Sequence, residues 1–326
     1  ALDIKLTGLG LVDGFNGTRG TLLAIFTNIN SIIGGTAVDK LTALNTDSTW
    51  NINPTPTPNT YTTSGVTLNF SKLETLVAGS GADTFAFIGS GALTGSIDGG
   101  LGTDTLDYSA STLSVTVNFP SQTASGVTGA VKNFENVLSN GLGVTIYGDE
   151  FDNLLIGSSG NDTIYGLGGN DTLIGLGGDD TLDGGAGIDT VNYSGSSAAV
   201  FVNLTLGIAN GTAIGNDALL NIENVIGSDY DDVLIGNAQN NTLTGGAGVD
   251  TLIGGAGDDV YVFGDNSGND SVIEQTSEGN DTFDFSSRIS SFTMTIDAPL
   301  AGVIENIIGG AGNDSFIFTN GTALAG

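Results

Sequence analysis

Short apolar and β-branched runs, each bounded by Gly, Asn and Asp, follow one another along this chain. Apolar and polar positions alternate within the runs and helical periodicity is nearly absent, so the pattern predicts short strands. From Gly148 to Asn192 the runs fall into five consecutive nine-residue units, and four more follow from Gly227 to Val262. A constant period of this kind predicts a repeat architecture rather than separate globular domains.

One unit, GLGGNDTLI at 166–174, illustrates how a turn and a strand combine. Its glycines permit the positive φ of a tight turn, and the strand that follows points Leu173 inward. Two units complete a coil of about 18 residues, and stacked coils lie about 4.8 Å apart. Because no coil can bury its own face alone, stability is a sum over neighbouring coils. The expected interior ladder consists of Ile164, Leu173, Leu182 and Val191.

A longer repeat surrounds these two runs. An F/I-E-N-V/I element recurs at 134–137, 222–225 and 304–307, and solitary nonapeptide-like copies start at 78, 99 and 309. The Pro- and Thr-rich stretch 51–60 predicts a loop or short linker, because three alternating prolines cannot join a sheet ladder. We therefore expect N-terminal cap or junction coils (1–60), degenerate solenoid coils (61–147), a first repeat run (148–192), intervening coils (193–226), a second run (227–262) and degenerate C-terminal coils (263–326).

Charge and composition narrow the possible partners. The chain of 326 residues has 36 acidic and 6 basic residues, a net charge of −30, no Cys and no His. Such a field repels phosphate backbones and anionic lipids, which argues against nucleic acid as a partner. The missing His excludes imidazole-based zinc sites and catalytic triads, and no apolar run approaches the ~18 residues of a membrane span. Since the first residue is not Met, we expect a processed form or an excerpt of a longer chain.

The same stacking brings acidic side chains together. Units two apart lie on the same edge, so Asp162 is expected over Asp180, Asp171 over Asp189, Asp232 with Asp250, and Asn241 with Asp259. Carboxylates this close repel unless a cation lies between them, and the glycine turns aim carbonyl oxygens into the same gap. An all-oxygen cage suits calcium better than magnesium, which demands tighter octahedral geometry. The predicted calcium ligands are Asp162, Asp171, Asp180, Asp189, Asp232, Asp250, Asp259, Asn153 and Asn241, with Asn153 supplying a weaker, neutral oxygen beneath Asp171.

A structural alternative exists for every Asp of this pattern, because Asp can cap a turn through its own backbone. Calcium is favoured for the uninterrupted runs, whereas the structural cap is favoured at the solitary copies, which contain Asp83, Asp104 and Asp314. The repeated acids Glu135, Glu223 and Glu305 are expected to have a structural role rather than a catalytic one.

These residues resemble the hemolysin-type calcium-binding, or RTX, repeat family. The resemblance rests on the strict motifs at 148–192 and 227–262. It implies an all-β, right-handed parallel β-solenoid or β-roll with several calcium ions in its turns, which is disordered without calcium. It also implies type I secretion and folding outside the cell.

Three functions of different classes remain open. The first is an extracellular structural protein, a segment of a fibre, surface layer, biofilm matrix or adhesin, which self-associates or contacts neighbouring surface proteins or polysaccharide. The second is the folding and secretion module of a type I-secreted exoenzyme. The third, ranked last, is a polysaccharide-acting enzyme, because the sequence has no acidic pair outside the calcium pattern. We therefore expect no catalytic activity.

Overall fold

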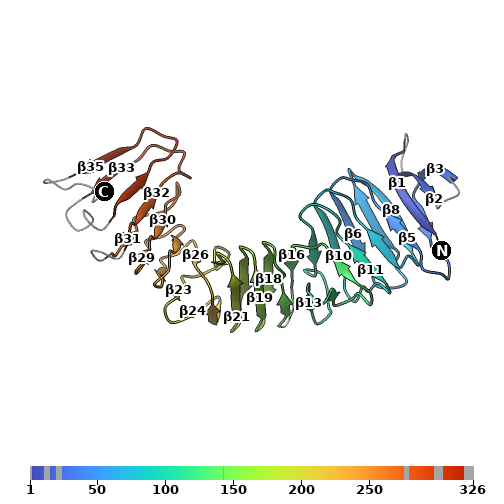
Figure 1. The fold of residues 1–326 in the computed structure, drawn as a ribbon, viewed down its shortest axis with the longest axis horizontal. Helices are drawn as coiled ribbons and strands as arrows, with labels where there is room; N and C mark the ends of the chain where they lie inside the picture. Colours follow the sequence, from blue (N-terminus) through green and yellow to red (C-terminus); the bar gives the residue numbers. More distant parts are fainter. Residues whose placement is uncertain are drawn as a thin grey trace. The chain divides into compact units, whose positions relative to one another are not determined.

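The turn-and-strand units of the sequence form short strands that pair with the unit two positions away. The computed structural model describes residues 2–10, 15–19, 24–141, 143–274, 279–296 and 304–318. The chain divides into an N-terminal unit, 1–164, and a C-terminal unit, 165–326, and each is described by itself. All regular elements in the described residues are β-strands, and Figure 1 shows them stacked side by side within each unit.

The strands of the N-terminal unit are β1 (Asp3–Leu9), β2 (Phe15–Arg19), β3 (Ala24–Ile29), β4 (Ser31–Ile33), β5 (Lys40–Thr42), β6 (Ser48–Ile52), β7 (Asn59–Thr63), β8 (Val66–Ser71), β9 (Thr75–Val77), β10 (Asp83–Phe87), β11 (Ser96–Asp98), β12 (Thr105–Asp107), β13 (Thr116–Asn118), β14 (Thr123–Ala124), β15 (Val131–Lys132), β16 (Asn136–Leu138), β17 (Thr145–Tyr147) and β18 (Leu154–Ser158). The next strand, β19 (Thr163–Gly168), contains the boundary.

The strands of the C-terminal unit are β20 (Thr172–Leu176), β21 (Thr181–Ala186), β22 (Thr190–Asn192), β23 (Phe201–Asn203), β24 (Ile208–Gly211), β25 (Gly215–Leu220), β26 (Asn224–Ile226), β27 (Val233–Ile235), β28 (Thr242–Thr244), β29 (Thr251–Ile253), β30 (Val260–Val262), β31 (Ser271–Val272), β32 (Thr282–Asp284), β33 (Thr293–Ile296), β34 (Asn306–Ile308) and β35 (Ser315–Phe318).

Two faces of mainly parallel strands run along the C-terminal unit. One face has the order β34-β32-β30-β28-β26-β22-β20, and the other has the order β21-β25-β24-β23-β27-β29-β31. Within the second run, Thr242 of β28 pairs with Val260 of β30, so the register advances by one coil of two nonapeptides. This pairing confirms the parallel β-solenoid that the repeat period predicts.

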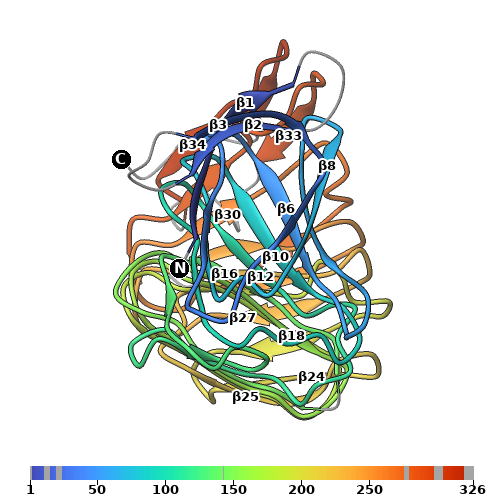
Figure 2. The same ribbon diagram turned by 90° about the vertical axis from the view of Figure 1, so that its right-hand side faces the viewer.

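Antiparallel hairpins interrupt the solenoid in both units. In the N-terminal unit β6, β7 and β8 pair antiparallel, and the Pro-rich stretch supplies the connection between β6 and β7. Parallel stacking resumes from β6 through β10 to β12, which run side by side in Figure 2. In the C-terminal unit β23, β24 and β25 form an antiparallel insertion between two parallel stretches.

The interior of each unit is apolar, as the alternation predicts. The expected ladder residues Ile164, Leu173, Leu182 and Val191 are all fully buried. Larger side chains fill the irregular coils, where Trp50 stacks on Phe85 with ring centroids 5.1 Å apart. Trp50 is therefore a core residue of the N-terminal unit. No helix in the described part of the chain is long and apolar enough to cross a membrane.

Candidate metal sites

All the predicted ligands lie in turns that immediately precede strands, and all are buried. Their exposed fractions lie between 0% and 3% for Asn153, Asp162, Asp171, Asp180, Asp189, Asp232, Asn241, Asp250 and Asp259. Burial of a carboxylate without compensation is costly, so each side chain needs donors or a cation nearby.

The clearest stack of carboxylates lies beside β27, β29 and β31. The backbone N–H of Asp232 donates to Oδ1 of Asp250 at 2.8 Å, and the N–H of Asp250 donates to Oδ1 of Asp270 at 3.0 Å. The second oxygen of Asp250, Oδ2, is buried and has no hydrogen-bond partner among the described residues. One oxygen thus aligns neighbouring coils, while the other is left for a further ligand.

Electrostatics at Asp250 favours a cation. The pKa of Asp250 is raised to about 7, mainly by burial and in smaller part by the nearby carboxylates of Asp270 and Asp232, against the lowering effect of the hydrogen bond from the Asp232 N–H. Burial also raises the pKa values of Asp232 and Asp270. A divalent cation would reverse this effect, because it favours the ionised form of each carboxylate.

Glycine makes room for this stack. A Cβ added to Gly245 would lie 2.1 Å from Oδ2 of Asp250, and one added to Gly246 would lie 2.0 Å from the carbonyl oxygen of Ser228. Carbonyl and carboxylate oxygens therefore crowd around a turn that only Gly fits. Oxygen donors of these two kinds are what calcium prefers, so the residues present fit the predicted ion.

The family comparison agrees with this geometry. The profile of the RTX calcium-binding nonapeptide repeat matches residues 147–180, 156–191, 226–261 and 304–321. The chain carries RTX calcium-binding repeats. A comparison with curated proteins found no match.

The RTX matches confirm the predicted family and fold class. RTX repeats form parallel β-rolls, bind calcium and are typical of secreted proteins. Three of the matched stretches cover the two runs predicted from the sequence, and the fourth includes the solitary copy around Asp314. This last copy therefore belongs to the repeat family as well.

The opposite edge of the RTX coils carries a second stack. In the C-terminal unit the N–H of Asp171 donates to Oδ1 of Asp189 at 2.7 Å, and the N–H of Asn241 donates to Oδ1 of Asp259 at 2.7 Å. The structure therefore brings these two predicted pairs together, as it does Asp232 and Asp250. The pairs Asp162–Asp180 and Asn153–Asp171 join residues of different units and stay predictions.

On the edge that carries Asp232 and Asp250, the first Asp of each stack is held by protein donors. Ser228 donates to Asp232 through its N–H to Oδ2 and through Oγ to Oδ1, the latter at 2.8 Å. Ser158 donates to Asp162 in the same two ways, with an Oγ to Oδ1 distance of 2.9 Å. Serine at the second position of the nonapeptide thus marks the start of a stack.

The repeated Glu residues cap the Asp stacks. The N–H of Asp104 donates to Glu135, that of Asp189 to Glu223, and that of Asp281 to Glu305, at 2.7, 2.9 and 2.8 Å. Each Glu carboxylate thus takes the place of an Asp carboxylate in the next coil. This is the structural role that the sequence favoured.

Asparagine follows Glu in both units. The side-chain amide of Asn241 donates to the carbonyl oxygen of Glu223 at 2.8 Å, and its Oδ1 accepts the N–H of Asn237 at 2.7 Å. Asn153 makes the equivalent bonds to Glu135 and Asp149 at 3.1 and 2.8 Å. An Asp at either position would lack the side-chain amide that donates to the carbonyl oxygen of the Glu residue.

Three carboxylates of the stacks were not predicted as ligands. Asp217 accepts the N–H of Asp180 at 3.1 Å, and Asp281 accepts that of Asp259 at 2.9 Å. Asp270, the third, lies above Asp250. Each follows Gly-Asn and precedes an apolar residue by two positions, as do Asp162 and Asp171, so the triplet Gly-Asn-Asp is the signal that finds them: 215–217, 268–270 and 279–281.

A cluster of three carboxylates lies at the end of the second run. One oxygen each of Asp259, Glu274 and Asp281 lies within 4.8 Å of the others. Glu274 follows β31, whose Val272 pairs with Leu252 of β29, so Glu274 stands one coil above Gly254. Glu thus replaces the first Gly of the nonapeptide and adds a third acid to the Asp259–Asp281 step.

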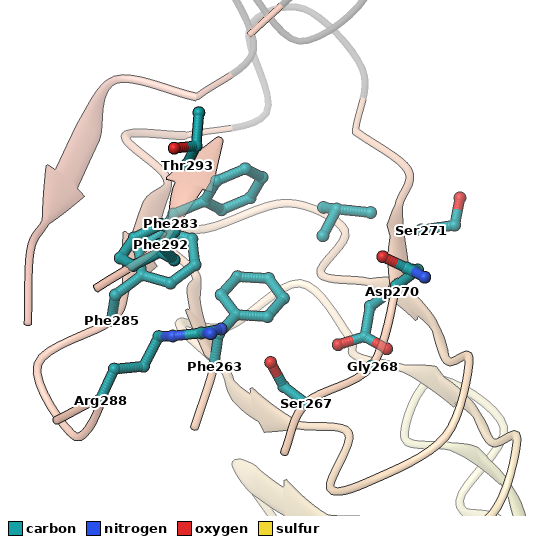
Figure 3. A pocket seen from close by; sticks show the side chains of 12 residues that line it. Phe263, Ser267, Gly268, Asp270, Ser271, Phe283, Phe285, Arg288, Phe292 and Thr293 are labelled. Carbon is teal, nitrogen blue, oxygen red and sulfur yellow. The ribbon is translucent and has the colours of Figure 1, made fainter. Parts of the chain in front are cut away.

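A hollow of about 400 Å³ adjoins Asp270. Figure 3 shows Phe263, Phe283, Phe285 and Phe292 around it, with Arg288 and Asp270 on opposite sides. The guanidinium of Arg288 lies 4.7 Å from the ring centre of Phe292. Large aromatic side chains thus line the interior after the last nonapeptide of the second run.

Proposed function

We propose that this chain is a calcium-binding extracellular structural protein, a segment of a fibre, surface layer, biofilm matrix or adhesin, which folds and self-assembles on binding calcium. The stack of Asp232, Asp250 and Asp270 carries the proposal. Without a cation these buried carboxylates repel one another across a single coil step, which opposes stacking. Calcium between the coils converts that repulsion into attraction, so metal binding and folding are coupled.

Self-association is the partner interaction that the repeats favour. Each solenoid coil offers its strands to the next coil, and a terminal coil that is left uncovered offers the same hydrogen-bonding groups to another chain. Neighbouring surface proteins or polysaccharide are further candidate partners.

We also propose that the chain has no catalytic role. The repeated acids support this proposal, because Glu135, Glu223 and Glu305 accept backbone N–H groups rather than facing a common cleft. A screen for reducing ends released from acidic and neutral polysaccharides tests it. Release above that of a heat-treated control would contradict the non-catalytic role.

Far-UV circular dichroism with light scattering, recorded while calcium is added to chelated protein, tests the main proposal. We expect a calcium-selective gain of β-signal and compaction at about 10⁻⁴–10⁻³ M, the range of extracellular sites, with magnesium as the control. Growth of scattering after folding supports an assembling structural protein. Folding without growth favours the folding and secretion module of an exoenzyme, and full β-structure in excess chelator contradicts calcium-dependent folding.

A further inference from the structure

The solitary copies of the N-terminal unit form a stacked pair of turns outside the residues matched by the RTX profile. Their sequence favours structural caps, because no nonapeptide lies two units away. In the structure, however, β10 and β12 are parallel neighbours, with Thr84 opposite Thr105. The partner of Asp104 is therefore Asp83, which lies 21 residues earlier instead of 18.

The contacts of Asp104 match those of Asp250 in the second run. Oδ1 of Asp104 accepts the N–H of Asp83 at 2.8 Å, the distance at which Oδ1 of Asp250 accepts the N–H of Asp232. Both side chains are fully buried, and Oδ2 of each has no hydrogen-bond partner among the described residues. A Cβ on Gly99 would meet Oδ2 of Asp104 at 2.6 Å, as one on Gly245 would meet Oδ2 of Asp250 at 2.1 Å.

The turns themselves have the same conformation. Gly100 and Gly102 have φ values of 102° and 123°, and the corresponding Gly246 and Gly248 have 104° and 127°. Backbone carbonyls of the preceding turn lie directly against them. A Cβ on Gly100 would be 2.2 Å from the carbonyl oxygen of Gly79, and one on Gly102 would be 2.3 Å from that of Gly81.

The lower member of the pair also follows the pattern of the second run. Asp83 accepts hydrogen bonds from Ser48 Oγ and from the N–H of Gly79, as Asp232 does from Oγ and N–H of Ser228. The N–H of Asp104 itself donates to Glu135 at 2.7 Å, so a third carboxylate lies beside this pair. Acidic side chains therefore gather near Oδ2 of Asp104, an oxygen that no donor among the described residues satisfies.

We propose that the turns 79–83 and 99–104 bind a calcium ion, with Oδ2 of Asp104 as a ligand. The site deepens the proposed function and rests on it, because it extends calcium-dependent stacking into the N-terminal unit. Carboxylate and carbonyl oxygens around glycine turns give calcium the flexible, all-oxygen surroundings that it prefers.

Trp50 provides a local reporter for this site. It is the only Trp of the chain, and it lies on β6 opposite Phe85, two residues after Asp83. Terbium replaces calcium in oxygen cages and emits when a nearby excited Trp transfers energy to it. Excitation of Trp50 in the full chain should therefore give terbium emission that added calcium displaces.

Asp104→Asn should abolish this emission and lower the number of bound calcium ions by one in equilibrium dialysis. The matched control is Asp107→Asn, at the end of the strand that follows Asp104, where the half-buried carboxylate accepts the N–H of Ser109. Asp250→Asn should also keep the Trp50-sensitised signal, since it alters a pair of turns in the other unit. A far-UV circular dichroism spectrum equal to that of the wild type, recorded in saturating calcium, verifies that each variant folds.

Full emission and a full ion count in Asp104→Asn would overturn the proposal, as would wild-type protein without calcium-displaceable emission, which needs no variant to interpret. These outcomes differ from failure of the proposed function. If calcium folds the chain but Trp50 reports no terbium, only this site fails. If the chain is folded in chelator and Trp50 still reports a displaceable ion, the site stands and calcium-dependent folding fails.

Discussion

Glycine at the turn positions is required by close approach as well as by backbone conformation. Gly246 has a φ of 104°, and the Cβ of an alanine there would lie 2.0 Å from the carbonyl oxygen of Ser228. We expect Gly246→Ala to lower the free energy of unfolding in saturating calcium by about 1–3 kcal/mol, the cost of one strained backbone residue. Denaturant unfolding measures the loss.

Gly195→Ala is the matched control, because a Cβ at Gly195 meets no heavy atom within 4 Å. We expect it to change stability by less than about 1 kcal/mol, the scale of a Gly-to-Ala entropy effect. Equal losses in the two variants would contradict the steric argument for Gly246.

Asn241 is the residue at which a ligand role and a structural role predict opposite results. Asn241→Asp loses the amide donor to the Glu223 carbonyl and sets a carboxylate against that oxygen. We expect a loss of about 1–3 kcal/mol of stability, the cost of leaving a buried polar group unsatisfied, with no gain in calcium affinity. Denaturant unfolding and calcium titration together distinguish the structural role of Asn241 from a ligand role.

Asn240→Asp is the control for this change, because exposed Asn240 contributes only its amide oxygen, to the N–H of Asp258. A carboxylate can accept that bond equally well. Tighter calcium binding by Asn241→Asp would instead support the sequence-based prediction that position 241 is a weak ligand.

Each edge of the solenoid is an ordered series of turns rather than a uniform ladder. In the C-terminal unit one edge runs through Asp171, Asp189, Glu223, Asn241, Asp259, Asp281 and Glu305. Two consecutive Asp residues are followed by a Glu that caps them, and Asn restarts the series. Asp-on-Asp steps are therefore the places that favour a cation.

Asp250 belongs to two such steps, with Asp232 before it and Asp270 after it. We expect Asp250→Asn to weaken calcium binding at both steps and to raise the calcium concentration needed for folding several-fold. Circular dichroism during a calcium titration measures the shift. Asp229→Asn removes an exposed charge from a neighbouring turn and should leave the midpoint nearly unchanged, so equal shifts would indicate a net-charge effect.

The repeat period predicts the solenoid well, because in the uninterrupted runs residues that pair in neighbouring coils are separated by a constant two nonapeptides along the chain. It fails for Asp217, since the antiparallel strands β23 and β24 lie between Asp180 and its partner along the chain. The pairing of Asp83 with Asp104 is hidden for a similar reason, because its coil has 21 residues. The register of a stack is set by pairing in space, and insertions in a turn leave it intact.

Leu167 and Leu176 show a further limit of the sequence pattern. They occupy the second turn position with φ values of 79° and 75°, although glycines at the same position, such as Gly185 and Gly246, have φ values of 102° and 104°. Leucine tolerates the smaller angle at some cost, whereas the fourth position remains Gly with values of 99° and 118° at Gly169 and Gly178. The consensus residue at a turn position therefore predicts its φ value only approximately.

At the scale of the whole molecule, the stacked acids couple folding to pH as well as to calcium. Burial raises the pKa values of Asp104 and Asp250 to about 7, while carboxyl groups of the unfolded chain titrate near about 4. Between these pH values the folded chain binds more protons than the unfolded chain. In the absence of calcium, its stability therefore falls as the pH rises from about 4 to about 7 and then levels off.

Calcium should reverse this dependence of stability on pH, because it binds the ionised carboxylates and competes with protons for them. In chelator we expect a larger β-signal at pH 5 than at pH 8, and in saturating calcium a higher midpoint of thermal unfolding at pH 8 than at pH 5. Asp265 opposes the first trend, since hydrogen bonds from Ser290 lower its pKa, but it is exposed and single. Far-UV circular dichroism in chelator and thermal unfolding in calcium, each at both pH values, measure these effects. The combined variant Asp104→Asn and Asp250→Asn is the control, in which both pH effects should be diminished. A chelated wild type that is more stable at pH 8 would mean that the buried carboxylates are ionised and satisfied by protein donors, and that calcium is not needed to hold the coils together.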